Sequence, residues 1–217
     1  MSAPRLSLLG ALSILVAALA LACSGGGEKP AAQLPPTSTP TPTTTAKQYS
    51  VPPAMTINPA KTYLATIKTA KGDIVIRLRP DLAPNQVNSF VFLSREGFYN
   101  GVTFHRVIPG FVAQAGDPTG TGSGGPGYTL KAEFSSVPFD RGIVGAARTQ
   151  AVDSAGSQFF ITYARTQTTA SLDGLYTVFG EVIQGMDVVD KLTPRDTTRT
   201  PNAPAGDRII TIEIKEQ

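Results

Sequence analysis

The chain has 217 residues, of which 41% are hydrophobic and 16% are charged, and its formal net charge is +3. This length and composition suit one globular domain, with further segments outside it. The basic residues are scattered without a basic run or a basic helix, so we expect no nucleic-acid partner. A single histidine and a single cysteine exclude an internal disulfide and leave no cluster for a metal ion, and we expect neither a metal nor a cofactor.

The N-terminus has the order of an export signal: a basic residue, an apolar run from Leu6 to Ala22, and then Cys23 followed by small residues. The run is short for a spanning helix and lacks a basic stop-transfer cluster, which favours its removal. The segment Leu19-Ala20-Leu21-Ala22-Cys23 resembles the bacterial lipobox, although Ala20 stands where leucine is usual. The resemblance implies a lipoprotein signal peptide over residues 1–22 and lipidation of Cys23. The chain would then be anchored by lipid to the extracytoplasmic face of a bacterial membrane. An uncleaved signal anchor or an ordinary secretory signal is the alternative.

The next segment, from Ser24 to about Pro59, is rich in proline, threonine, alanine and glycine and has almost no large apolar side chains. Such a composition cannot bury a hydrophobic core, and its prolines favour extended backbone. We therefore predict a disordered tether over residues 23–59 and a folded domain over residues 60–217.

The folded part opens with two short apolar runs, Tyr63 to Thr69 and Asp73 to Leu78, joined by Ala70-Lys71-Gly72, which predicts a β-hairpin. A helix is expected over roughly Pro84 to Glu96. Proline is accepted at the first helical position, an apolar stripe follows at helical spacing, and Gly97 stands where a helix would end.

The rest of the domain consists mainly of short apolar runs divided by glycine or proline, which favours an antiparallel barrel or sandwich. We expect a second short helix over Gly185 to Leu192. The predicted strands are Thr103 to Ile108, Phe111 to Gln114, Gly142 to Ala147, Gln158 to Tyr163, Thr177 to Ile183 and a closing strand from Arg208 to Lys215.

One continuous segment carries a family resemblance. Phe104-His105-Arg106-Val107-Ile108-Pro109-Gly110-Phe111-Val112-Ala113-Gln114-Ala115-Gly116-Asp117 closely resembles the cyclophilin signature F-H-R-V-I-P-G-F-x-x-Q-x-G-D, and Gly156-Ser157-Gln158-Phe159-Phe160-Ile161, Leu172-Asp173-Gly174 and Val178-Phe179-Gly180 follow in the family's order. The resemblance runs from about Tyr63 to Gln217. It implies a mainly β domain, a closed eight-stranded antiparallel β-barrel capped by two α-helices. It also implies peptidyl-prolyl cis/trans isomerase activity on proline-containing polypeptide segments, and we expect a monomer.

The resemblance assigns roles to single residues. The catalytic residues would be Arg106, Phe111 and Gln114. The permanently charged guanidinium of Arg106 can hold the carbonyl before proline and approach the prolyl nitrogen as amide resonance is lost. The substrate-binding residues would be Val112, Gly122, Ala147, Gln158, Phe160, Leu172 and Tyr176.

The sequence departs from the family pattern at four places. Val112 replaces the usual methionine, Arg148 lies in Ala146-Ala147-Arg148-Thr149 where M-A-N-A is commoner, and Tyr176 stands where the pocket histidine would be. A tryptophan of some members is Ser171 here. Because that tryptophan lines the groove rim in cyclosporin-sensitive members, we expect this chain to bind cyclosporin weakly.

Two local patterns invite other interpretations. His105 is the single histidine, but strand alternation puts it on the face opposite Arg106, so we expect a hydrogen-bonded structural role. Residues 120–125 match G-x-G-x-x-G, yet Pro126-Gly127 make the helix required by a dinucleotide site implausible, and a flexible loop is the better interpretation.

Two other functions compete with isomerisation. The same groove could bind proline-containing segments as a holdase with negligible turnover. A hydrolase could use Ser157, His105 and Asp153, although no nucleophile elbow surrounds that serine.

Overall fold

The computed structural model describes residues 47–217. The predicted signal peptide, Cys23 and residues 24–46 of the predicted tether lie outside the described residues. Within the described range, no helix is both long enough and apolar enough to cross a membrane.

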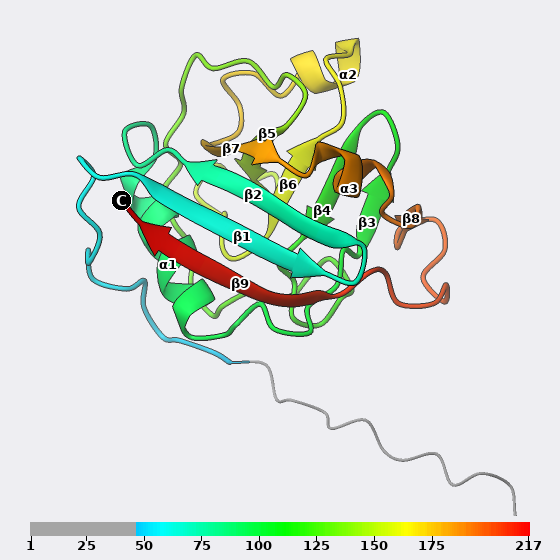
Figure 1. Cartoon of the computed structure of the whole chain (residues 1–217), viewed down its shortest axis with the longest axis horizontal. Helices are drawn as coiled ribbons and strands as arrows, with labels where there is room; N and C mark the ends of the chain where they lie inside the picture. The colour runs from blue at the N-terminus through cyan, green and yellow to red at the C-terminus, as the bar shows by residue number, and fades with distance from the viewer. Residues whose placement is uncertain (1–46) are drawn as a thin grey trace, which may run out of the picture. The chain divides into compact units, whose positions relative to one another are not determined.

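The described residues form a mainly β domain with three helices (Figure 1). The helices are α1 (Pro84–Arg95), α2 (Gln167–Ala170) and α3 (Met186–Asp190). The strands are β1 (Tyr63–Thr69), β2 (Gly72–Leu78), β3 (Arg106–Ile108), β4 (Val112–Ala115), β5 (Ile143–Ala146), β6 (Phe159–Thr162), β7 (Val178–Gln184), β8 (Arg195–Asp196) and β9 (Ile209–Glu216). The predicted hairpin, the long helix and a helix after Gly185 are confirmed, whereas α2 and β8 were not predicted.

The strands build one antiparallel sheet of nine strands in the order β8-β3-β4-β6-β5-β7-β2-β1-β9, curled into a half-barrel. The predicted closed eight-stranded barrel is therefore wrong, although the mainly β fold is confirmed. The described end strands β8 and β9 do not pair with each other. Irregular backbone spans the gap instead: the amides of Gly101 and Phe104 donate to the carbonyls of Ile209 and Asp207, each at 2.8 Å.

Helix α1 covers one side of the sheet, against β9 and β7. Its N-terminus has no side-chain cap of its own, and Pro84 occupies the first turn. The carboxylate of Glu133, distant in sequence, accepts hydrogen bonds from the backbone amides of Asn85 and Gln86 at 3.1 and 2.9 Å. A carboxylate at a helix N-terminus satisfies free amides and complements the helix dipole. This contact fixes where α1 begins.

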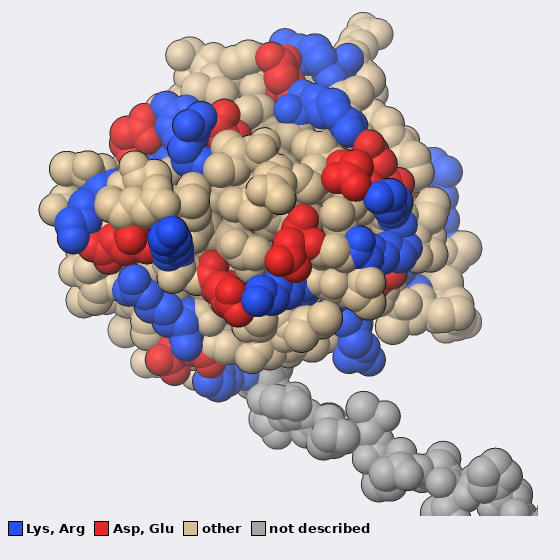
Figure 2. Space-filling model, viewed as in Figure 1, with Lys and Arg blue, Asp and Glu red and all other residues tan. Residues whose placement is uncertain are grey.

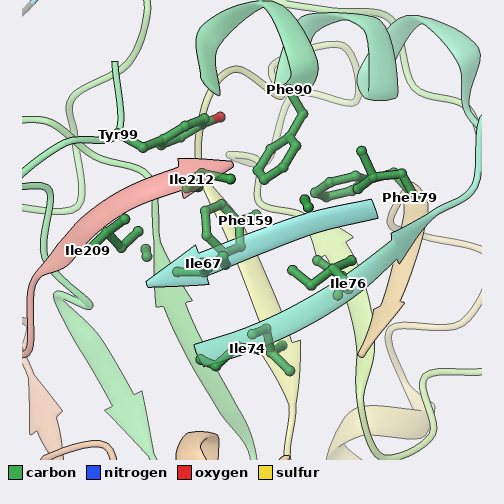
Figure 3. Close-up of a cluster of buried hydrophobic side chains, with 14 of the residues drawn as sticks. Ile67, Ile74, Ile76, Phe90, Tyr99, Phe159, Phe179, Ile209 and Ile212 are labelled. Atoms are coloured by element: carbon green, nitrogen blue, oxygen red, sulfur yellow. The ribbon is translucent and has the colours of Figure 1, made fainter. Parts of the chain in front are cut away.

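The core lies between α1 and the inner face of the sheet. Figure 3 shows Phe90 pointing from the helix toward Phe159 and the isoleucines of the strands. The Phe90 ring meets that of Phe159 at 5.6 Å and 89°, and that of Phe179 at 5.4 Å. Burial of each such side chain contributes about 1.5 to 3 kcal/mol, so this cluster accounts for much of the fold's stability.

The outer face of β1, β2 and β9 is charged. Figure 2 shows both signs interspersed across it. Cross-strand and neighbouring pairs include Lys68 with Glu213 at 2.7 Å and Arg77 with Glu181 at 2.6 Å. These pairs are exposed to solvent and contribute little to stability, but they keep this face polar.

Residues 47–59, which we call the strap, belong to the folded unit, so the structure differs from the predicted boundary between tether and domain. Ile57 is only 6% exposed, and the amides of Thr56 and Ile57 donate to the side-chain oxygen of Asn88 on α1. The ring of Tyr49 packs edge-on against Phe92, with centroids 5.1 Å apart. Two apolar side chains and one buried asparagine thus hold a segment whose overall composition predicts disorder.

Candidate functional site

Strand register brings the central site residues together. Arg106 on β3 lies opposite Gln114 on β4, Gln114 lies opposite Phe160 on β6, and Phe160 lies opposite Gly145 on β5. We call these four residues the outer row. The adjacent positions, Val107, Ala113, Ile161 and Val144, are buried in the core. Because side chains alternate along a strand, the outer row faces away from the core.

Arg106 lies at one end of this row. Its guanidinium carbon is 5.3 Å from the centre of the Phe111 ring, a cation–π distance that helps to fix the fork. Across the strand pair Arg106 lies opposite Asp196 of β8. Hydrogen bonds from Thr198 lower the pKa of the Asp196 carboxyl, and the positive charge of Arg106 lowers it further. Sequence reasoning missed Asp196, because a two-residue strand leaves no periodic signal.

An apolar floor lies beside the arginine. The Phe160 ring packs on Phe139 at 5.3 Å and meets Tyr176 edge-on at 5.7 Å and 83°. Gly145 makes this possible, since a Cβ there would approach Phe160 to 2.5 Å and Phe139 to 2.7 Å. Phe139 and Gly145 were not predicted as site residues, because neither has a side-chain pattern that marks it as part of a floor.

The floor belongs to a pocket of about 150 Å³. Helix α2 leads the chain to one wall of the pocket. Thr166 and Thr169 cap its N-terminus reciprocally, and after the helix the chain turns through Ser171 to Leu172, which lines the pocket. The lining residues are Arg106, Phe111, Val112, Gln114, Ala147, Arg148, Phe160, Leu172 and Tyr176. A pocket of this kind can hold a small apolar ring next to a fixed positive charge.

A larger cavity of about 840 Å³ shares Gln114, Ala147 and Arg148 with this pocket. Gln114 donates from its side-chain amide to the Gln158 oxygen at 2.9 Å, and Gln158 donates to the carbonyls of Gly122 and Gly124 at 3.0 and 2.9 Å. Gly122 has φ +93°, and the loop around it forms no helix. The prediction that the glycine-rich match is a loop is therefore confirmed.

The structure thus places every predicted site residue of the described part along these two adjoining cavities. The predicted catalytic residues Arg106, Phe111 and Gln114 line the small pocket, and Gly122 and Gln158 line the larger cavity. Their roles in catalysis and binding stay predictions.

His105 lies on the opposite face from Arg106, as alternation predicts, and is 1% exposed. In the described part of the chain neither ring nitrogen has a partner that meets hydrogen-bond geometry, and the backbone of Thr103 provides only a weaker interaction, which favours the charged ring. Burial lowers the pKa of His105, because it disfavours the charged imidazolium.

The hydrolase alternative finds no support in the geometry. The Ser157 hydroxyl donates to the carbonyl of Gly116 at 2.7 Å, and the Asp153 carboxylate accepts from the amide of Ala132 at 2.9 Å. Because His105 bonds to neither of these side chains, the three form no proton relay.

Comparisons with known proteins agree with this architecture. The family model described as cyclophilin type peptidyl-prolyl cis-trans isomerase/CLD matches residues 64–214. A probable peptidyl-prolyl cis-trans isomerase of Brucella suis biovar 1 is 43% identical over 178 residues, which cover 76% of this chain and 88% of the relative.

Solved structures give the same result. The crystal structure of a Cryptosporidium parvum cyclophilin type peptidyl-prolyl cis-trans isomerase is 32% identical with a TM-score of 0.64, and the match covers 72% of this chain and 99% of that one. A second structure of that protein, in the presence of the dipeptide Ala-Pro, is 33% identical with a TM-score of 0.63 and covers 71% of this chain and 99% of that one. This chain belongs to the cyclophilin-type peptidyl-prolyl cis-trans isomerases.

Proposed function

We propose that this enzyme accelerates rotation about X-Pro bonds in extracytoplasmic polypeptides and so assists their folding. Amide resonance opposes this rotation, which takes tens of seconds or longer when uncatalysed. To reach an ordinary turnover of ~10 to 10³ per second, the enzyme must lower the barrier by roughly 3 to 7 kcal/mol. No bond is broken, so a positioned charge and a shaped pocket suffice.

The observation that carries the proposal is the outer row, which sets Arg106 beside the apolar floor of Phe160. The floor would hold the pyrrolidine ring while the preceding residue turns. Arg106 would hold the carbonyl before proline and approach the prolyl nitrogen as that atom becomes pyramidal and regains its lone pair. Gln114, oriented by Gln158, would bond to the peptide backbone.

The decisive measurement is a coupled isomerisation assay on a proline tetrapeptide. We expect turnover that follows enzyme concentration and falls when Arg106 is replaced. If the folded protein bound the peptide but left its isomerisation rate unchanged, the holdase alternative would replace catalysis.

The location of the enzyme is proposed from the lipobox resemblance at Cys23. Two or more acyl chains on this residue would provide stable anchoring, with the domain held on the extracytoplasmic side. Cys23→Ser should release the processed chain from the membrane fraction, and Ser24→Ala should leave it there. Membrane retention of a processed Cys23→Ser chain would contradict lipid anchoring. Sedimentation of the released chain tests the expected monomer.

A further inference from the structure

We infer that Arg148 gives the enzyme a preference for proline segments that carry an acidic side chain one or two residues before the proline. This inference rests on the proposed isomerase function and names the substrate class of the same site. Arg148 lines both the small pocket and the larger cavity. A polypeptide with proline in the pocket and a flanking residue in the cavity must therefore pass this side chain.

The charge balance of the two cavities supports the inference. Among the described residues that line them, Arg106 and Arg148 carry charge and no aspartate or glutamate is present. Arg106 faces Asp196 across the strand pair, so its charge is partly balanced. Arg148 has no carboxylate within salt-bridge distance in the part of the chain that the structure describes.

The guanidinium of Arg148 is also held in place. It lies 4.7 Å from the centre of the Tyr176 ring. Its Nε donates to the carbonyl of Leu175 at 2.9 Å, and one terminal nitrogen donates to the carbonyl of Thr149 at 2.9 Å. These acceptors are neutral, so they orient the fork without cancelling its charge. The second terminal nitrogen donates to no described group, and its N–H groups are free to bind a carboxylate.

The loop that carries Arg148 supplies no competing acid at the cavity. Its single acidic residue, Asp153, is engaged by the backbone amide of Ala132 at 2.9 Å. A glutamate or aspartate of the substrate would therefore be the first carboxylate to reach this guanidinium. Because the site is open to water, we expect a gain of about fivefold in kcat/KM, which corresponds to about 1 kcal/mol.

The test uses the full chain in mild detergent and pairs of peptides that differ by one isosteric residue. Glutamate and glutamine are compared immediately before proline, and then two residues before it, in the isomerisation assay. We expect a Glu/Gln ratio of kcat/KM near five in at least one position at low salt, falling toward one in 0.5 M salt, where the Debye length is about 4 Å. Arg148→Gln should bring the ratio to about one, and Arg148→Glu should invert it.

The control variant is Lys68→Gln, which removes one positive charge on the outer face of β1, where Lys68 pairs with Glu213. It should keep the wild-type ratio. A ratio near one in both positions for the wild-type enzyme overturns the inference, as does a preference that survives Arg148→Gln. Absence of isomerisation with every peptide would instead contradict the proposed function itself.

Discussion

The strap provides a direct test of how the N-terminal side of the domain is held. Asn88, which is 2% exposed, donates to the carbonyls of Pro53 and Ala54 at 3.3 and 3.0 Å. Its oxygen accepts from the amides of Thr56 and Ile57 at 2.9 and 3.3 Å. Each bond contributes about 0.5 to 1.5 kcal/mol net, but bonds that share one oxygen do not add, and the freed strap groups can reach water. We therefore expect Asn88→Ala to cost about 2 to 3 kcal/mol.

The assay is reversible thermal and urea unfolding. A loss of this size corresponds to a fall in melting temperature of about 4 to 12 °C for a protein of this length. Asn85→Ala is the matched control: it makes the same change one turn earlier on α1, at a residue whose side chain bonds to Glu133 at 2.8 Å. We expect it to cost less than about 1 kcal/mol. If Asn88→Ala unfolded like the wild type, the bonds between Asn88 and the strap would contribute nothing to stability, and the reasoning would be wrong.

Four further outcomes are expected. Arg106→Ala and Arg106→Lys should each lower kcat at least about tenfold with little change in unfolding free energy, because the lost interaction is made mainly in the transition state; near-normal turnover of either folded variant would refute that role. Gly145→Ala should cost about 1 to 3 kcal/mol by overpacking and raise KM, because the new Cβ displaces Phe160; urea unfolding and kinetics measure both effects. Inhibition titrations should show weak cyclosporin binding that tightens about thirtyfold in Ser171→Trp; unchanged sensitivity would mean that this position is not at the rim. Burial lowers the pKa of His105 from 6.5, so below that pH the unfolded chain binds more protons than the folded chain. The free energy of unfolding should therefore fall as the pH drops through 6.5, and it should fall less in His105→Leu.

The sequence predicted site residues on strands, such as Arg106 and Phe160, and in loops, such as Leu172, and these residues line the cavities. Alternation of side chains along the strand correctly places Arg106 and His105 on opposite faces. The pairing of β4 with β3 and with β6 then sets Gln114 opposite Arg106 and Phe160. The site residues that the sequence could not predict depend on contacts between distant segments. Phe139 reaches the floor from an irregular loop, and its position under Phe160 depends on the missing side chain of Gly145.

Two fold predictions failed for a related reason. The strap has the composition of a disordered segment, and its contacts with Asn88 and Phe92 make it part of the domain. Closure of the barrel depends on the ends of the sheet, where β8 (Arg195–Asp196) does not pair with β9. The local sequence pattern indicates the structural propensity of a segment. The ordering of the strap and the closure of the barrel depend instead on contacts with distant parts of the chain.

The position of β1 has a consequence for the order in which this chain can fold. Strand β1 forms a hairpin with β2 through a tight turn, but its other edge pairs with β9, so that Tyr63 lies opposite Glu216. Pairings between residues so far apart in sequence form slowly, because a long loop must close first. A growing chain therefore presents the free edge of β1 until β9 has been made, and such an edge invites pairing with other chains. Loss of β9 would make that exposure permanent, so β9 protects the first strand of the domain from aggregation.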